Sequence, residues 1–206
     1  IGIYAGSNSQ AQNAVAVGYQ AGCNAQGAQA TAVGVSAGKV SQGLYGTALG
    51  QDAGMTSQGQ FGTALGHSAG YNVQGEYATA VGYAAGQADQ GTHAVAVGYQ
   101  AAIAGQSDNA TAVGRDAGRN AQGSLGTAIG CEAGKTSQGG IATAVGYRAG
   151  FNAQGANATA MGYNAGCASQ GTNSVAMGSQ AGLNAQGAQS VAVGYAAGSA
   201  SQGDNA

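Results

Sequence analysis

A sixteen-residue unit repeats along the whole chain without insertion or deletion. Residues 15–30 read VAVGYQAGCNAQGAQA, and each later block of sixteen keeps the same plan, down to residues 191–206. The first fourteen residues fit the same register, entered at its third position, so the 206 residues hold thirteen units. A repeat of this length is typical of a solenoid, in which each unit stacks on its neighbours. We therefore expect one solenoid domain over residues 1–206.

The positions of the unit, counted from Val15, predict its local structure. Position 1 is Val or Thr, position 2 is Ala, and position 3 is aliphatic or Met, which is the alternation of a short strand. A second strand is expected over positions 9–12. Glycine at positions 4, 8 and 13, with rare exceptions, supplies the turns. The sequence predicts an all-β, parallel β-solenoid of thirteen coils with two short strands per coil.

The constant alanines at positions 2 and 7 are the candidates for the inside of the coil, which makes position 3 point outward. An outward apolar column of this length implies burial against another chain, so we expect a homo-oligomer. The opposite assignment, valine inside and alanine outside, would make a self-sufficient monomer. The candidate interface, called the apolar column below, consists of Val17, Val33, Leu49, Leu65, Val81, Val97, Val113, Ile129, Val145, Met161, Met177 and Val193.

Position 12 is glutamine in every unit. Stacked in register, the side-chain amides are expected to form a hydrogen-bonded ladder along the solenoid, with a structural role. The ladder comprises Gln26, Gln42, Gln58, Gln74, Gln90, Gln106, Gln122, Gln138, Gln154, Gln170, Gln186 and Gln202.

Aromatic residues recur at two positions. Tyr45, Phe61 and Tyr77 occupy position 15 of three successive coils, and an exposed aromatic surface of this kind binds glycans or protein ligands. The alternative, packing against a neighbouring subunit or loop, is favoured over binding. Six tyrosines at position 5 are expected to form a rim beside the apolar column: Tyr19, Tyr83, Tyr99, Tyr147, Tyr163 and Tyr195.

One coil departs from the pattern. Residues 95–110 carry Ala102 and Ser107 where the other coils have glycine. We expect a locally altered turn around residues 103–107.

Charge is sparse, with five basic and seven acidic residues and a net charge of −2. This gives no electrostatic footprint for nucleic acid or anionic lipid. No apolar run approaches the roughly 20 residues that span a bilayer. We expect no nucleic-acid partner and no membrane segment in these residues.

No arrangement of side chains points to catalysis, a cofactor or a metal. His67 and His93 lie in different columns of the repeat, without a nucleophile beside them. Asp116 and Glu132 share position 6 in adjacent coils, but basic residues flank them, including Arg148 in the same column. A surface charge ladder is therefore favoured over a pair of catalytic acids, and the protein is not expected to be an enzyme. The three cysteines lack zinc spacing and are expected to be free thiols.

The unit resembles the head repeat of trimeric autotransporter adhesins of the YadA type, approximately x-S-V-A-I-G-x-x-[SA]-x-A-x-G-x-x-S. The matching elements are VAVG or TAVG, the alanine at position 7, the glycine at position 13 and the small residue at position 16; the best local match is residues 173–178, NSVAMG. The family repeat is about two residues shorter and lacks the glutamine column. Similar repeats occur in viral and phage fibre proteins. The resemblance implies a left-handed parallel β-roll with three chains packed side by side.

Two functions follow as hypotheses. The first is a non-enzymatic structural or adhesive fibre, extracellular on a cell or virion surface, with an extracellular protein or glycan as ligand. Because the chain ends at the last residue of a repeat without an atypical capping unit, we expect it to be part of a longer fibre. The second is ice binding, which the eight threonines at position 1 would suit. A paired Thr-x-Thr motif is missing, and Leu, Met and Ile at position 3 interrupt the regularity, so the fibre ranks first.

Overall fold

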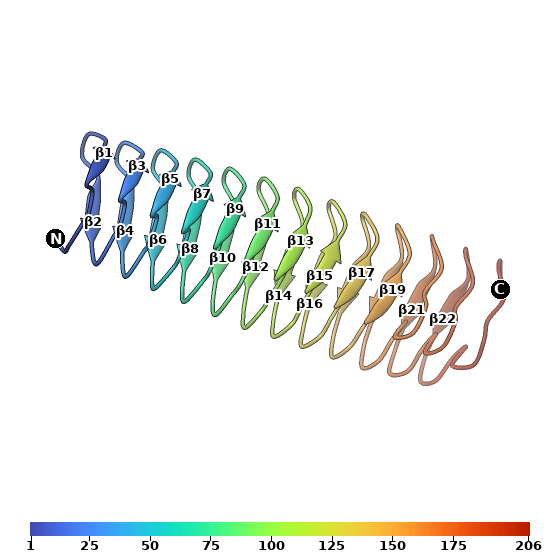
Figure 1. Ribbon diagram of the computed structural model, residues 1–206. Helices are drawn as coiled ribbons and strands as arrows, with labels where there is room; N and C mark the ends of the chain where they lie inside the picture. Colours follow the sequence, from blue (N-terminus) through green and yellow to red (C-terminus); the bar gives the residue numbers. More distant parts are fainter. The chain divides into compact units, whose positions relative to one another are not determined.

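The computed structural model describes residues 1–206 as two compact units, residues 1–105 and 106–206. Each unit is a parallel β-solenoid without helices, and its strands are labelled in chain order in Figure 1. Paired residues lie sixteen positions apart, as in the pairing of Ala80 with Ala96, so one turn takes one sequence repeat. The predicted fold class is confirmed in each unit. The single domain over residues 1–206 stays a prediction.

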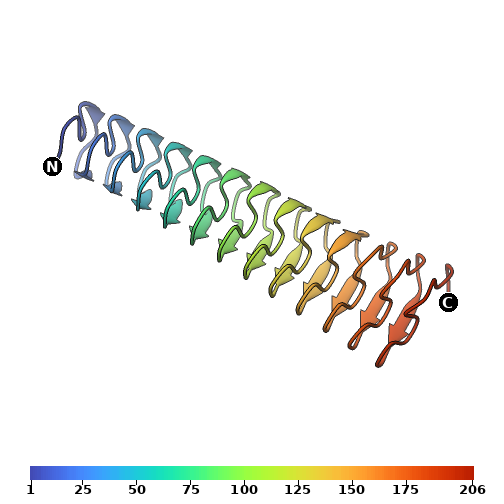
Figure 2. The same ribbon diagram turned by 60° about the horizontal axis from the view of Figure 1, so that its bottom comes forward.

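In the first unit, strands of three residues alternate between two parallel sheets, which form two rows in Figure 2. One sheet contains β1 (Asn8–Gln10), β3 (Asn24–Gln26), β5 (Val40–Gln42), β7 (Thr56–Gln58), β9 (Asn72–Gln74) and β11 (Ala88–Gln90). The other contains β2 (Val15–Val17), β4 (Thr31–Val33), β6 (Thr47–Leu49), β8 (Thr63–Leu65), β10 (Thr79–Val81) and β12 (Val95–Val97).

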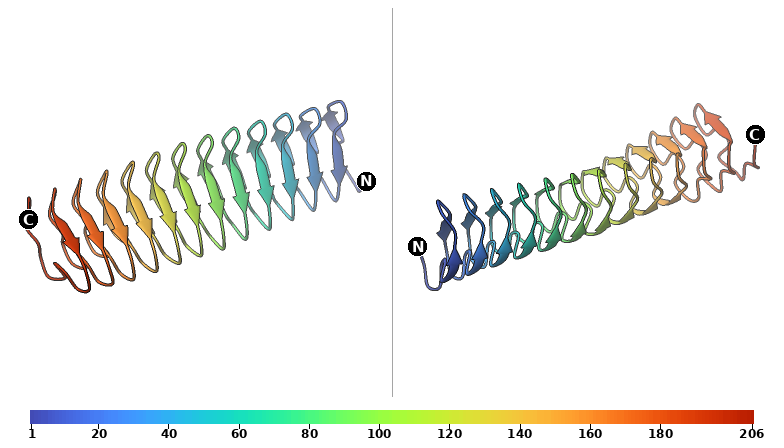
Figure 3. Two further views of the ribbon diagram at one scale, coloured as in Figure 1. Left: turned by 180° about the vertical axis from the view of Figure 1, so that it is seen from behind. Right: turned by 90° about the horizontal axis from the view of Figure 1, so that it is seen from above.

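The second unit repeats this arrangement, and the strands that share a sheet point the same way in Figure 3. One sheet contains β14 (Thr111–Val113), β16 (Thr127–Ile129), β18 (Thr143–Val145), β20 (Thr159–Met161), β21 (Val175–Met177) and β22 (Val191–Val193). The other contains β15 (Asn120–Gln122), β17 (Thr136–Gln138) and β19 (Asn152–Gln154), and it continues as isolated parallel bridges through Gln170, Gln186 and Gln202. The unit boundary falls within β13 (Ala104–Gln106).

Alanine lines the inside of each coil. Ala48 at position 2, Ala53 at position 7 and Ala78 at position 16 are all fully buried, and the same columns are buried in the other coils that carry alanine there, except near the ends of the chain. Of the two assignments that the sequence leaves open, the structure has alanine inside and the apolar column outside. A core of methyl groups buries little apolar area per residue, so polar contacts must supply more of the stability.

The glutamines of position 12 fill the remaining interior. Gln58 is buried, and its Nε2 donates to the carbonyl oxygen of Thr47 at 2.9 Å and to that of Gly62 at 3.1 Å. Since Thr47 begins β6 in the opposite sheet, one amide ties the two sheets of a coil together. A buried amide is tolerated only when it is hydrogen-bonded in this way, because its desolvation is otherwise unfavourable.

The turns rely on left-handed backbone. At position 4, Gly66 has φ +129°, and a Cβ built there would lie 2.5 Å from the carbonyl oxygen of Gly82 in the next coil. Positions 6, 11 and 15 are left-handed with residues other than glycine in most coils, as at Asp52 (φ 56°), Ser57 (φ 53°) and Phe61 (φ 57°). Only glycine fits position 4, whereas the other three positions accept side chains at a cost in strain.

The altered turn expected near residue 103 is absent, so that prediction was wrong. Ala102 takes φ 47°, close to the φ 53° of Gly86 at the same position one coil earlier, and β13 follows as in other coils. In the second unit, Ser107 donates its backbone N–H to the carbonyl of Gln122 at 3.0 Å, the bond that glycine makes elsewhere. A single left-handed alanine costs about 1–2 kcal/mol, and the contacts between stacked coils offset this cost.

Candidate functional site

The apolar column lies on the outer face of the sheet that contains the even-numbered strands. Because successive side chains of a strand point to opposite faces, burial of Ala64 sends its neighbours Thr63 and Leu65 outward. Every member of the column is half-buried or exposed in each unit, and Leu65 retains 44% of its surface and Met177 retains 40%. The single chain thus presents an apolar row to solvent. Its role as an interface stays a prediction.

Position 1 forms a second row on the same outer face. In the first unit, Thr31, Thr47, Thr63 and Thr79 are paired in register, one per coil, and each is half-buried. Neighbouring strands of a sheet lie about 4.8 Å apart, which sets the spacing of the row. The face therefore carries a hydroxyl row beside an apolar row and no charged side chain.

The aromatic residues of position 15 form a continuous stack in the first unit. The rings of Tyr45, Phe61 and Tyr77 follow one another with centroids 4.9 Å apart and planes within 7° of parallel. His93 extends the stack beyond Tyr77 at 4.9 Å. The three residues predicted from the sequence are brought together, each 43–49% exposed, and His93 was missed although it occupies the same repeat position.

A second aromatic column runs along position 5. In the first unit, His67 stacks on Tyr83 at 5.2 Å, and Tyr83 stacks on Tyr99 at 5.2 Å. In the second unit, Tyr147 stacks on Tyr163 at 5.4 Å. In each coil, position 5 is separated from the apolar residue at position 3 by a single glycine, so these exposed rings border the apolar face. The sequence identified the tyrosines as a rim but left His67 out.

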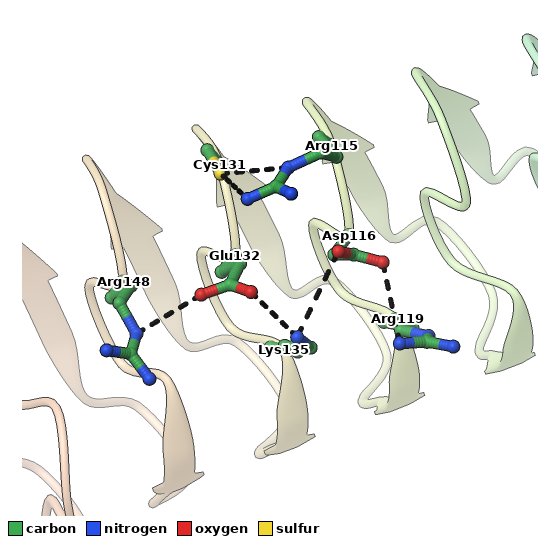
Figure 4. A network of polar contacts seen from close by, with 7 residues as sticks. All are labelled: Arg115, Asp116, Arg119, Cys131, Glu132, Lys135 and Arg148. Carbon is green, nitrogen blue, oxygen red and sulfur yellow. Dashed lines mark hydrogen bonds and ion pairs between the residues drawn. The ribbon is translucent and has the colours of Figure 1, made fainter.

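Asp116 and Glu132 lie within a network of basic side chains in the second unit, drawn in Figure 4. Lys135 Nζ donates to Glu132 Oε1 at 2.8 Å and lies 3.9 Å from Asp116 Oδ2. Arg119 lies 3.6 Å from Asp116, and Arg148 Nε lies 3.2 Å from Glu132 Oε2. The lysine ammonium therefore links the two carboxylates, which is the charge ladder that the sequence favours over a pair of catalytic acids.

Electrostatics in this network follow from the same contacts. The hydrogen bond from Lys135 holds the pKa of Glu132 below its ordinary value, against the opposing effect of desolvation. Arg115 donates to the sulfur of Cys131 at 3.0 Å from Nη2, which raises the pKa of Arg115. Burial raises the pKa of the Cys167 thiol. All three cysteines are free.

The structure contains no cavity that could enclose a small molecule, and no group of three or more His, Cys, Asp or Glu side chains is placed to hold a metal ion. It has no helix with the length and apolarity of a membrane-spanning segment. The features that remain as candidates for function are all open surfaces: the outer sheet face, the two aromatic columns and the charge network.

A protein-family model matches part of the chain. The YadA head domain repeat matches in two copies, over residues 142–165 and 169–197 of the second unit. The first copy covers β18 and β20, and the second covers β21 and β22, so the outer face is part of the matched region. The predicted resemblance is confirmed over these residues. A search of curated proteins finds no match to the chain.

Proposed function

We propose that the chain is a structural and adhesive segment of an extracellular fibre, on a cell or virion surface, that assembles through the outer sheet face that carries the apolar column. The observation that carries the proposal is the apolar column, which is half-buried or exposed at every coil of each unit. Monomeric proteins rarely leave an apolar patch of this extent in water. The YadA head repeat supports a surface role and suggests three chains per assembly. No catalytic step is part of this function.

The composition of the face fits an interface between copies of the chain. Its two rows hold Val, Leu, Ile, Met and Thr without a charged residue, and tyrosines border it at position 5. Protein interfaces share this anatomy, with an uncharged centre and a rim rich in aromatic side chains. The interior of the coil holds mainly alanine and glutamine, so the larger apolar side chains, including those of the apolar column, lie on the surface.

Sedimentation of a matched pair of variants tests the proposal. Leu65→Asp places a charge in the apolar column, whereas Leu44→Asp places one at position 14, where other coils already carry Glu76 and Asp108. Both leucines are about equally exposed, at 44% and 40%. We expect an oligomer for wild type and Leu44→Asp, and monomers for Leu65→Asp. A monomeric wild type at micromolar concentration would overturn the proposal, as would an unchanged Leu65→Asp oligomer.

The second candidate is ice binding, which the in-register row of Thr31, Thr47, Thr63 and Thr79 favours. A regular hydroxyl row on a flat face suits a repeating crystal plane, although the neighbouring row varies in side-chain size. Thermal hysteresis of the wild type, abolished by Thr63→Leu in a protein that stays monomeric, would establish this function and displace the first. Hysteresis absent from dilute wild type would eliminate it.

A further inference from the structure

Basic residues are concentrated in a small part of the second unit. Of the five lysines and arginines in the chain, four lie between residues 115 and 148, together with two acidic residues. This basic cluster comprises Arg115, Arg119, Lys135 and Arg148, from three successive coils. It carries a local net charge of +2 in a chain whose net charge is −2. We propose that the basic cluster binds an anionic linear polysaccharide that lies along the solenoid.

The two carboxylates of the network do not neutralise the cluster. Lys135 is committed to them, since it is 2.8 Å from Glu132 and 3.9 Å from Asp116 and only 19% exposed. The arginines then act as the outward charges. Arg148 shares Glu132 through Nε, and Arg119 approaches Asp116 no closer than 3.6 Å. Three cations thus share two carboxylates and, together with Arg115, leave two positive charges in excess for a ligand.

Arginine donors remain available on the surface. Arg115 is exposed and forms no ion pair with a carboxylate, because its guanidinium donates to the sulfur of Cys131 instead. The side chains of Arg119 and Arg148 are 33% and 37% exposed, so part of each guanidinium faces solvent. A guanidinium presents its donors in a fixed planar fork that matches carboxylate and phosphate oxygens, and sulfate offers the same pattern.

Aromatic rings lie beside these charges. Arg148 sits over the ring of Phe151 at 4.2 Å, which orients its guanidinium. Tyr147 precedes Arg148 in the chain, is exposed, and stacks on Tyr163 of the next coil. Sugar rings pack their C–H groups on aromatic surfaces, so a row that combines arginine with tyrosine suits a charged saccharide better than a simple ion.

The repeat of the solenoid also favours a linear polymer as the ligand. Equivalent side chains of successive coils are about 4.8 Å apart, and one sugar residue of an extended polysaccharide advances by a similar distance. The absence of a cavity argues against a small ligand. A nucleic acid is disfavoured, since the rest of the chain carries one basic residue against five acidic ones and would repel a longer polyanion.

Arg148, Arg119 and Lys135 lie outside the proposed assembly face, because they occupy positions 6 and 9 of the repeat. Arg115, at position 5, lies at the rim of that face. Lys39 provides a matched control, since it lies at position 9 like Arg119 but in the first unit. Removing its charge changes the net charge of the chain by the same amount as removing one arginine of the cluster.

The test measures binding of the intact chain to three probes: heparin, which is sulfated, polygalacturonate, which is carboxylated, and dextran, which is neutral. We expect binding to one or both anionic probes and none to dextran. Arg115→Gln and Arg148→Gln should each weaken binding to the anionic probe about tenfold, and the double variant should weaken it more. Lys39→Gln should weaken the same binding less than twofold. The salt dependence should fall with each arginine removed, because fewer counterions are released.

Several outcomes would overturn the proposal. These are no binding to either anionic probe at low salt, equal losses for Lys39→Gln and the arginine variants, or equally tight binding of single-stranded DNA, which would indicate charge attraction alone. Heparin against polygalacturonate distinguishes sulfate from carboxylate as the recognised group. Oligomeric state, measured on the same samples, reports on the assembly face independently, so either proposal can fail without the other. Far-UV circular dichroism establishes that each variant is folded.

Discussion

Gln58 donates from its Nε2 to the Oε1 of Gln74 in the next coil at 3.1 Å, inside the solenoid. The same bond joins Gln42 to Gln58 at 3.1 Å and Gln138 to Gln154 at 3.1 Å. Each amide also donates to backbone carbonyls of its own coil. The glutamine ladder therefore replaces the large apolar side chains of an ordinary core, and its side-chain bonds join successive coils from Gln42 to Gln90 and from Gln138 to Gln170.

Gln58→Ala should destabilise the protein strongly. The substitution leaves the buried carbonyls of Thr47 and Gly62 without their donor and opens a cavity, at a cost of about 3 kcal/mol. Ser57→Ala is the control, because Ser57 is exposed and other coils carry alanine at that position. Guanidinium denaturation followed by circular dichroism measures both. Equal midpoints for the two variants would show that the ladder contributes nothing.

Two glycines of one coil should respond differently to alanine. Gly66→Ala brings a Cβ to 2.5 Å from the backbone oxygen of Gly82, which cannot move aside, so we expect misfolding or a loss above about 3 kcal/mol. Gly70→Ala meets the flexible side chain of Gln74 at 3.0 Å and the methyl group of Ala64 at 3.3 Å, and Ala102 already occupies this position of the repeat. It should cost about 1 kcal/mol. Thermal unfolding of both variants decides the point, and a reversed order would contradict this account of the turns.

The repeat allowed the fold class, the coil length and the strands to be predicted, because period-two alternation and spaced glycines are local signals. Which strand face is inside was left open, since Val15-Ala16-Val17 fits either assignment until coil width is known. The prediction of an altered turn near Ala102 was wrong because it treated glycine as obligatory at a position where left-handed alanine is only unfavourable. The contact of Lys135 with two carboxylates depends on side-chain reach between coils, which a column of letters does not specify.

The aromatic stack should contribute little net free energy to the stability of the fold. Phe61 contacts Tyr45 and Tyr77, and each stacked pair contributes about 0.5–1.5 kcal/mol. Phe61→Asn loses these contacts but relieves the strain of φ 57°, because asparagine tolerates left-handed backbone, so the net loss should be below about 1 kcal/mol. Phe61→Val loses the contacts and keeps the strain, so it should cost about 2 kcal/mol. Denaturation of the pair tests this ranking, which equal losses would refute.

Acid should weaken the contact between Glu132 and Lys135. The hydrogen bond from Lys135 lowers the pKa of Glu132 from its ordinary value of 4.5. A carboxyl whose pKa is lower in the folded state adds stability above its unfolded pKa and loses it as the pH falls through the folded pKa. The coupling energy of a double-mutant cycle with Glu132→Gln and Lys135→Gln should therefore be constant from neutral pH to about pH 5 and decline below pH 4.5. Since both side chains lie near the surface, the coupling should stay below about 1 kcal/mol. A coupling that persists unchanged to about pH 2 would mean that the contact does not depend on the ionised carboxylate.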